Sequence, residues 1–492
     1  MPVNITQKPL CFSTSVNRGD LPVGQPIIFA ISEPTIVATK ERVKFIAQVH
    51  IDHQPVSTGM VSSRVGLFKV TPNNVGIGIF DLRPILETYV KPDNMGSQSG
   101  GGATFKGYGK AKGFTMPVHL IDKFSLGDNS CKYFAVKFKI EYAEPGTTTV
   151  LNPGQGGNTG NSESTIQYTY YNTVVSYDDS LTVIGNDFGY NMAERYMTGI
   201  TSKFLSDAPL VQYAALEDYG TMAFLSLLPN TTDYVRSIKI VYFSTSGVLL
   251  NTETIDNQMS NGGAGGGGAS YARYIHFGIF PANLQGWSSW FSGNMGSVGS
   301  YSVTALDAST PTQFPISLIY TVKIVCTNTP KGPISLDPNK GFERIRITWL
   351  NRWGAWDYYT FNMKSVRSIK TNRIPYTQMS GTWNEKSYDI QGYKGGKKNF
   401  RVNTTENIKF NSDFVTEEEG AWFEQLIGST EVYILKCFNS TTLPANNVAL
   451  NTEVQPITIT NSSFTRKTKA NDKLMQYTFE AEKGKVNRTH TV

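Results

Sequence analysis

The 492-residue sequence is poor in the side chains that carry most enzyme chemistry, because it contains only five histidines and four cysteines. His50 and His53 flank Asp52 near the end of an expected strand, but no further ligand residue lies close by in the sequence, so no metal site is predicted. The cysteines lie more than a hundred residues apart, which excludes metal-ligand spacing and a local disulfide framework. Each lies in or near an apolar stretch, so we expect buried free thiols at Cys11, Cys131, Cys326 and Cys437.

Charge and long apolar runs are also scarce. Charged residues make up 17% of the sequence, against about 25% in a typical soluble domain. No apolar run approaches the roughly 18 residues that would span a bilayer, and the start at Met1 lacks the charged and apolar regions of a signal peptide. We therefore expect no membrane insertion and no secretory export. Gly, Asn, Ser and Thr take the place of the missing charges, which favours short strands joined by many turns.

Apolar residues alternate with polar ones along most of the sequence, as is typical of β-strands. Between Val43 and Ile51 every second residue is apolar, and the segments 133–142 and 474–480 show the same period. Between such segments, glycine-rich stretches predict loops: Gly96–Gly113, Asn152–Asn161 and Asn261–Ser270. The pattern predicts an all-β protein, built from tandem β-sandwich domains followed by a C-terminal β domain that carries one short helix.

Four short strings recur in the same order along the first two thirds of the sequence, at offsets of 183, 195, 200 and 186 residues: 25–28 with 208–211, 43–46 with 238–241, 75–80 with 275–280, and 136–138 with 322–324. Each match is weak alone, but together they favour an internal duplication. We therefore predict an N-terminal sandwich over 1–175 with glycine-rich insertions, a second sandwich over 176–340 that duplicates it, and a third domain over 341–492.

Two helices have recognisable start signals. Asp81 can cap a short helix over Asp81–Val90, in which Pro84 lies in the first turn. Thr416 and Glu419 have the spacing of a capping box, which predicts a helix over 417–427. This capping role explains the acidic run 417–419 without any acid–base chemistry. The apolar face of the second helix consists of Trp422, Phe423, Leu426 and Ile427.

A lysine-rich turn imitates a phosphate-binding loop without satisfying its pattern. The string Gly392–Lys398 lacks the Gly-x4-Gly-Lys-Ser/Thr spacing, and a strand rather than a helix is expected to follow it. The segment 361–492 holds 18 Lys or Arg and 13 Asp or Glu, so most of the net charge of +6 lies there. Two interpretations remain for Lys394, Lys397 and Lys398: a solvated turn, or contacts to an acidic partner.

Aromatic residues gather at two places, and each place allows two interpretations. Trp287, Trp290 and Phe291 could anchor a loop as a small core, or form an exposed platform for a sugar or a neighbouring subunit. The dense run Trp349–Phe361 predicts a hairpin with its turn at Asn351–Ala355. Its aromatics could form a domain core against the helix over 417–427. Alternatively, Arg352, Trp353 and Trp356 could form a subunit interface.

At these residues the sequence resembles virion structural proteins of tailed phages of marine and Bacteroidetes bacteria. The resemblance rests on LNRWGAWDYYTF at 350–361 and TEEEGAWFEQLIGSTEVY at 416–433, with PNNVGIGIFDLRPILETYVK and MPVHLIDKFSL in the N-terminal part. It implies a virion component of the tail, tail hub, baseplate or neck, assembled in the bacterial cytoplasm. It also implies other virion proteins as partners. It supplies no catalytic residues.

The sequence thus predicts a non-enzymatic structural subunit. It is expected to hold its neighbours in a symmetric homo-oligomer within the particle, without a cofactor, a metal or a specific nucleic acid. One alternative is a receptor-binding tail protein that uses Trp287 and Trp290 on a host-surface glycan. Another is a tail enzyme that degrades polysaccharide, which would need two carboxylates facing each other across a groove.

Overall fold

The computed structural model describes most of the chain, namely residues 3–9, 20–24, 26–52, 64–95, 117–127, 129–151, 164–171, 192–226, 234–257, 259, 273–307, 312–325, 343–382, 385–435, 454–465, 475–484 and 487–491. The three glycine-rich stretches lie wholly or almost wholly outside them, as do Cys11, His53, Cys326 and Cys437. The fold is mostly β, as expected, with several sheets and a few short helices. It forms two compact units: unit 1 comprises Met1–Ile324 with Asn351–Asp357, and unit 2 comprises Val325–Leu350 with Tyr358–Val492.

The first part of unit 1 is a β-sandwich. Its larger sheet has the order β2-β10-β8-β4-β5, with β9 beside β8, and its smaller sheet has the order β1-β3-β6. The strands are β1 Asn4–Gln7, β2 Asp20–Pro22, β3 Ile28–Ser32, β4 Glu41–Asp52, β5 Arg64–Val70, β6 Ile77–Asp81, β8 Cys131–Ala143, β9 Val150–Leu151 and β10 Ser164–Tyr171. Alternation in β4 buries Phe45, Ala47 and Val49 between the sheets.

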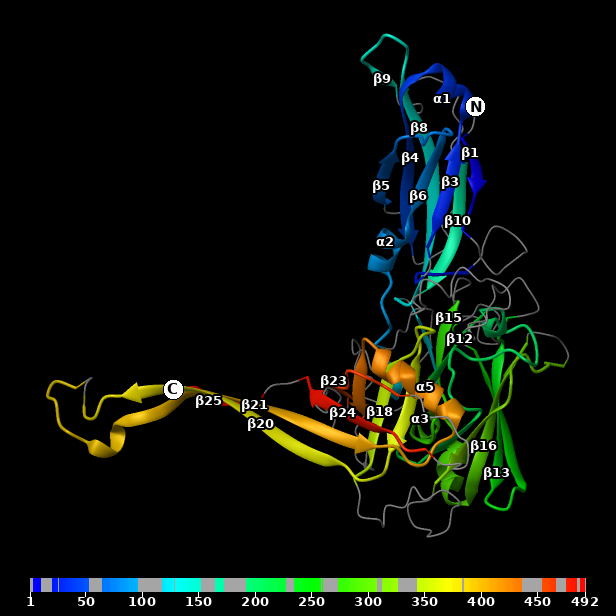
Figure 1. Cartoon of the computed structure of the whole chain (residues 1–492). Coiled ribbons are helices and arrows are strands. Elements are labelled where there is room, and N and C mark those ends of the chain that lie inside the picture. The colour runs from blue at the N-terminus through cyan, green and yellow to red at the C-terminus, as the bar shows by residue number, and fades with distance from the viewer. Residues whose placement is uncertain are drawn as a thin grey trace. The chain divides into compact units, whose positions relative to one another are not determined.

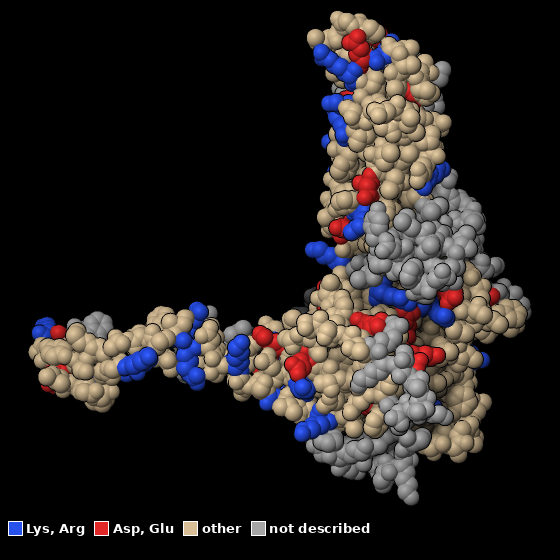
Figure 2. Space-filling view, in the orientation of Figure 1, with Lys and Arg blue, Asp and Glu red and all other residues tan. Residues whose placement is uncertain are grey.

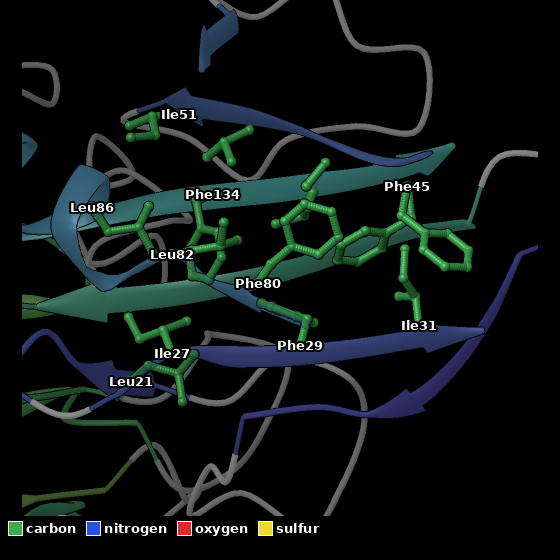
Figure 3. Close-up of a cluster of buried hydrophobic side chains, with 14 of the residues drawn as sticks. Leu21, Ile27, Phe29, Ile31, Phe45, Ile51, Phe80, Leu82, Leu86 and Phe134 are labelled. Carbon is green, nitrogen blue, oxygen red and sulfur yellow. The ribbon is translucent and has the colours of Figure 1, made fainter. Parts of the chain in front are cut away.

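The core of this sandwich is aromatic and aliphatic (Figure 3). Phe138 of β8 lies 5.3 Å from the ring of Phe29 and 5.8 Å from that of Phe80, so β8 packs on β3 and β6 of the smaller sheet. The expected helix after β6 is confirmed but shorter, with α2 Arg83–Leu86 followed by a 3-10 turn over Glu87–Tyr89. Asp81 Oδ1 accepts a hydrogen bond from the Arg83 amide (3.0 Å), but the N-cap of α2 is Leu82, so the predicted cap at Asp81 is wrong by one residue. The short helix α1, Pro34–Thr39, precedes β4.

The second part of unit 1 is another sandwich. Its larger sheet has the order β11-β17-β16-β13-β14, and the smaller has the order β12-β15-β7. The strands are β7 Phe124–Leu126, β11 Val211–Ala214, β12 Thr221–Leu225, β13 Ser237–Ser244, β14 Leu249–Asp256, β15 Tyr274–Gly278, β16 Val298–Leu306 and β17 Tyr320–Ile324. Short helices α3 Pro281–Trp287 and α4 Ser289–Asn294 follow β15.

The two sandwiches share one topology. Taken in chain order, β2, β3, β4, β5, β6, β8 and β10 correspond to β11, β12, β13, β14, β15, β16 and β17. In each larger sheet, the strand that comes first in the sequence pairs in parallel with the strand that comes last (β2 with β10, and β11 with β17). The other pairs are antiparallel. The two sandwiches therefore have the same strand order, and the internal duplication stays a prediction.

Only two of the four string matches fall on corresponding strands. The match of 43–46 with 238–241 joins β4 to β13, and that of 75–80 with 275–280 joins β6 to β15. The match of 136–138 with 322–324 is wrong, because β8 corresponds to β16 rather than to β17. The match of 25–28 with 208–211 is also wrong, since these segments enter β3 and β11. Short alternating strings resemble one another whichever strand they form.

One strand links the two sandwiches. β7 lies between β6 and β8 in the sequence, yet it pairs with β15 in the second sandwich, from Ile275 with Leu126 to Phe277 with Phe124. The Nδ2 atom of Asn283 in α3 donates to the carbonyls of His119 and Ile121, just before β7, at 3.0 and 2.6 Å. The two expected sandwich domains therefore share unit 1 up to Ile324.

Unit 2 contains one eight-stranded sheet of order β19-β18-β22-β23-β24-β21-β20, with β25 paired to β21. The strands are β18 Ile345–Leu350, β19 Trp356–Phe361, β20 Val366–Gln378, β21 Gly396–Asn411, β22 Val432–Leu435, β23 Val454–Ile459, β24 Thr478–Lys483 and β25 Asn487–Thr491. Helix α5, Glu417–Gly428, packs on this sheet. Its predicted capping box between Thr416 and Glu419 is confirmed.

The core of unit 2 is a run of ring contacts between α5 and the sheet. Trp349 of β18 lies 4.8 Å from Trp422, and Tyr359 of β19 lies 4.9 Å from Phe423. Phe361 joins this layer to Phe410 and Phe479 of the sheet, at 4.6 and 5.5 Å. Aromatic pairs of this kind contribute about 0.5–1.5 kcal/mol each beyond the area they bury. The predicted packing of the aromatic hairpin on the helix is thus confirmed for its two strands.

Candidate interaction surfaces

The turn between β18 and β19, Asn351–Asp357, has a tightly determined backbone. Asn351 Oδ1 accepts hydrogen bonds from the amides of Trp353 (2.9 Å) and Ala355 (3.0 Å), and the Asn351 amide donates to the Ala355 carbonyl. Gly354 has a φ of 77°, a left-handed conformation that a side chain disfavours. Asparagine and glycine at these positions therefore set the shape of the turn.

This turn belongs to unit 1, where a partly buried ion-pair cluster holds it. Asp207 accepts from Arg352 Nε at 2.7 Å and from an Arg195 terminal nitrogen at 2.5 Å. The Arg195 guanidinium lies 3.8 Å from the ring centroid of Trp353 and also donates to the carbonyls of Phe204 and Ser206. Because Arg195 is buried, this carboxylate and these carbonyls compensate for its lost hydration.

Further hydrogen bonds attach the turn to distant parts of unit 1. Trp356 Nε1 donates to the Asp93 carbonyl at 3.1 Å, and its ring meets His119 edge-on at 4.8 Å. Tyr274 of β15 donates through its hydroxyl to the Gly354 carbonyl at 2.7 Å. The Ser206 hydroxyl donates to Asp357 at 2.5 Å. The turn therefore contacts residues that precede β7 in the sequence, Asp93 and His119, and residues that follow it, Ser206 and Tyr274.

Burial decides between the two interpretations of this turn. Trp353 is 0% exposed and Trp356 is 2% exposed, so neither offers a surface to a second subunit. Arg352 is partly exposed, but its Nε is engaged by Asp207. The interface interpretation is corrected for the two tryptophans. Both tryptophans have partners inside unit 1, namely Arg195 for Trp353 and His119 for Trp356.

The second aromatic cluster also forms a small core. The ring of Tyr242 in β13 lies 5.0 Å from that of Trp290 and 5.6 Å from that of Phe291. Ser288 caps α4 by accepting from the Phe291 amide, and its hydroxyl donates to Glu253, which also accepts from the Tyr242 hydroxyl. Burial, and then Glu253, raise the pKa of Tyr242. Phe291 is fully buried, and Trp287 and Trp290 are half-buried, which supports the loop-anchoring interpretation.

The third predicted surface lies on a long hairpin that we call the arm: β20, β21 and the connection 379–395. Its strands pair from Val366 with Lys409 to Gln378 with Gly396. Nearly all of β20 is exposed, and in Figure 1 the arm extends as a two-stranded ribbon beyond the other strands of its sheet. Because the outer part of the arm is a two-stranded ribbon without a core of its own, its side chains there remain available for contacts.

The structure gathers the three predicted lysines at the far end of the arm. Lys394 lies in a 3-10 turn over Gly392–Lys394, and Lys397 and Lys398 begin β21. Lys397 and Lys398 are exposed, and Lys398 Nζ lies 2.6 Å from Gln378 Oε1 across the hairpin. The turn is therefore part of a hairpin and not a phosphate-binding loop, as the sequence predicts.

At its base the arm is tied to unit 2 by ion pairs. Arg367 pairs with Glu343 and Glu406, Lys483 pairs with Glu406 at 2.5 Å, and Lys409 pairs with Glu480 at 2.9 Å. Burial opposes ionisation of Glu406, but hydrogen bonds from Lys483 and Arg367 outweigh it and lower the pKa of that carboxyl. This network of ion pairs holds the base of the arm against the rest of unit 2 and does not involve the far end of the arm.

From the sequence, His276 could be either a packed or a surface imidazole, and the structure shows that it is buried. Burial lowers the pKa of His276 in β15 to about 3, and its ring packs edge-on against Tyr274. In the part of the chain that the structure describes, no group of three or more His, Cys, Asp or Glu side chains could hold a metal ion, and Cys131 is partly rather than fully buried. Within the same residues, no helix has the length and apolarity needed to cross a membrane.

Comparison with known proteins adds no assignment, since no family model and no curated protein matches this sequence.

Proposed function

We propose that this protein is a non-enzymatic structural subunit of a tailed-phage virion, located in the tail, hub, baseplate or neck. The arm is the observation that carries the structural role. It exposes eight large apolar side chains over 46 residues: Val366, Ile369, Ile374, Met379, Tyr388, Ile390, Tyr393 and Phe400. Exposed apolar surface that no core requires is typical of a contact surface for another protein. The phage assignment rests on the sequence resemblance at 350–361 and 416–433.

The aromatic turn and the acidic run, which are the most conspicuous features of the sequence, both stabilise the fold. This suits a structural role. The aromatic turn closes unit 1, and the acidic run at Thr416–Glu419 caps α5. The glycan-binding alternative requires exposed tryptophan faces, whereas Trp287 and Trp290 are half-buried and Trp290 packs on Tyr242. The geometry therefore favours assembly over receptor binding.

The proposal is tested by mass spectrometry of virions purified from the culture in which the gene is expressed. A structural subunit is retained at constant stoichiometry to the major virion proteins through density-gradient purification. A protein that separates from the particles, or that occurs only in the unassembled fraction of the lysate, would refute the assignment.

A further inference from the structure

The net charge of the chain is concentrated in the arm. Residues 366–411 contain nine Lys or Arg and three Asp or Glu, which gives +6, the net charge of the entire sequence. The rest of the chain therefore carries 36 residues of each sign. Figure 2 shows Lys and Arg side chains along the arm. A basic surface on an otherwise neutral chain favours an acidic partner surface.

An equal charge of opposite sign follows directly in the sequence. Residues 412–435, which include α5 and β22, contain six Asp or Glu and no Lys or Arg: Asp413, Glu417, Glu418, Glu419, Glu424 and Glu431. Beside the start of α5 lies Phe414, an exposed aromatic ring with 53% of its surface accessible. We call Asp413, Phe414 and the first turn of α5 the acidic face.

Neighbouring carboxylates on the acidic face repel one another. Burial raises the pKa of Glu419, and the charges of Asp413 and Glu418 raise it further, against the hydrogen bonds that Glu419 makes with Thr416. A cationic surface placed there would relieve this repulsion. The far end of the arm offers that chemistry, because Lys394, Lys397 and Lys398 adjoin Tyr393, which is 80% exposed.

The arm of one chain does not fold back onto its own acidic face. β21 runs 16 residues from Gly396 to Asn411, so the hairpin is on the order of 50 Å long at about 3.3 Å per residue. Helix α5 begins at Glu417, only six residues beyond the base of the arm, which limits its distance from the base to about 20 Å. The lysine-rich end therefore lies at least roughly 30 Å from the acidic face of the same chain.

We propose that the arm docks on a second copy of this chain, with its lysine-rich end on the acidic face of that copy. The arm supplies cations and exposed apolar side chains, and the acidic face supplies carboxylates and Phe414. Ile369, Ile374 and Ile390 are exposed aliphatic residues and suit a protein partner. A nucleic acid would instead be bound through cations on its phosphates and aromatic rings stacked on its bases. The inference rests on the proposed structural role, because it names the partner.

The geometry allows two modes of assembly. Two copies can exchange arms about a two-fold axis, or each arm can bind the next copy in a ring or a chain. Both modes use the same contact between Lys394, Lys397 and Lys398 of one copy and Glu417 and Glu418 of the other. Both also predict that association weakens as salt screens the charges, over a Debye length of about 3 Å at 1 M salt.

The test is a charge swap in the full chain, followed by sedimentation velocity at low and high salt. Wild type is expected to associate with increasing concentration at low salt. Reversal of the arm (Lys394→Glu/Lys397→Glu/Lys398→Glu) and reversal of the face (Glu417→Lys/Glu418→Lys) are each expected to weaken association by roughly a hundredfold. Combining both reversals restores opposite charges and is expected to restore association.

A matched control reverses three exposed cations outside the arm: Lys44→Glu/Arg64→Glu/Lys91→Glu makes the same change in net charge and is expected to leave association unchanged. Circular dichroism verifies that each variant folds. A wild type that stays monomeric at every concentration would overturn the inference, and so would an arm reversal that still associates. A monomer that is nevertheless found in virions overturns the inference alone, whereas a self-associating protein absent from virions overturns the proposed function alone.

Discussion

The buried imidazole of His276 makes the stability of unit 1 depend on pH. Its pKa falls to about 3 because burial disfavours the charged ring, whereas an unfolded chain has a value of about 6.5. The unfolded state therefore binds more protons between these two values. The stabilisation is complete above about pH 6.5 and is lost as the pH falls toward 3, at a limiting slope of about 1.4 kcal/mol per pH unit.

The perturbation is a shift from about pH 7.5 to about pH 5, for which linkage predicts a loss of about 2 kcal/mol from this residue alone. His276→Phe and His276→Leu remove the titration and retain an apolar side chain. Urea unfolding followed by pulsed hydrogen exchange assigns the transition to unit 1 through peptides from β12 and β15. Subtracting the pH dependence of a variant from that of wild type isolates the histidine.

The expected double difference is about 2 kcal/mol in favour of the variants at the lower pH. It is independent of the cost of each substitution, because that cost is present at both pH values. Identical pH dependences in wild type and both variants would show that His276 is not buried as a neutral ring. The linkage argument would then be refuted.

Three further predictions concern the turn, the helix cap and the arm. Gly354→Ala is expected to destabilise unit 1 by about 1–2 kcal/mol, because a side chain disfavours its positive φ; Gly199→Ala, whose added methyl meets nothing within 4 Å, is the control in urea titrations. Thr416→Ala should cost unit 2 about 1 kcal/mol by removing the capping box, and an unchanged unfolding midpoint would contradict this. Ile390→Ser/Tyr393→Ser should change thermal stability by less than about 0.5 kcal/mol per site, since both side chains are exposed; a larger loss in calorimetry would mean that the arm end packs on its own chain.

Local patterns predicted local structure well. Alternation identified β4, and the spacing of Thr416 and Glu419 identified the start of α5 to the residue. The match between 43–46 and 238–241 fell on corresponding strands because β4 and β13 both keep their apolar alternation. Local strings could not show that β16 rather than β17 is the counterpart of β8, because strand order depends on pairing between distant segments.

Contacts between residues far apart in the sequence could not be predicted from local patterns. The sequence placed the turn between Asn351 and Ala355 correctly, but Trp353 meets Arg195, more than 150 residues away. Nothing in the spacing of the aromatics indicates that partner. The lysines at the end of the arm were identified from the sequence, whereas their exposure required the length and pairing of the hairpin. No local signal predicted that β7 pairs with β15 alongside His276.

The division of the chain between its two units has a consequence for the order of events during synthesis. Unit 1 ends at Ile324 but is completed only by Asn351–Asp357, which emerges after β18 of unit 2. Domains generally fold from the N-terminus as the ribosome releases them. Here unit 1 cannot complete its contacts until part of unit 2 has emerged, because Arg195 contacts Trp353 and Asp207 pairs with Arg352. A nascent chain stopped at residue 340 would therefore hold two sandwiches without the segment that closes them, and a chain released at 360 would supply it.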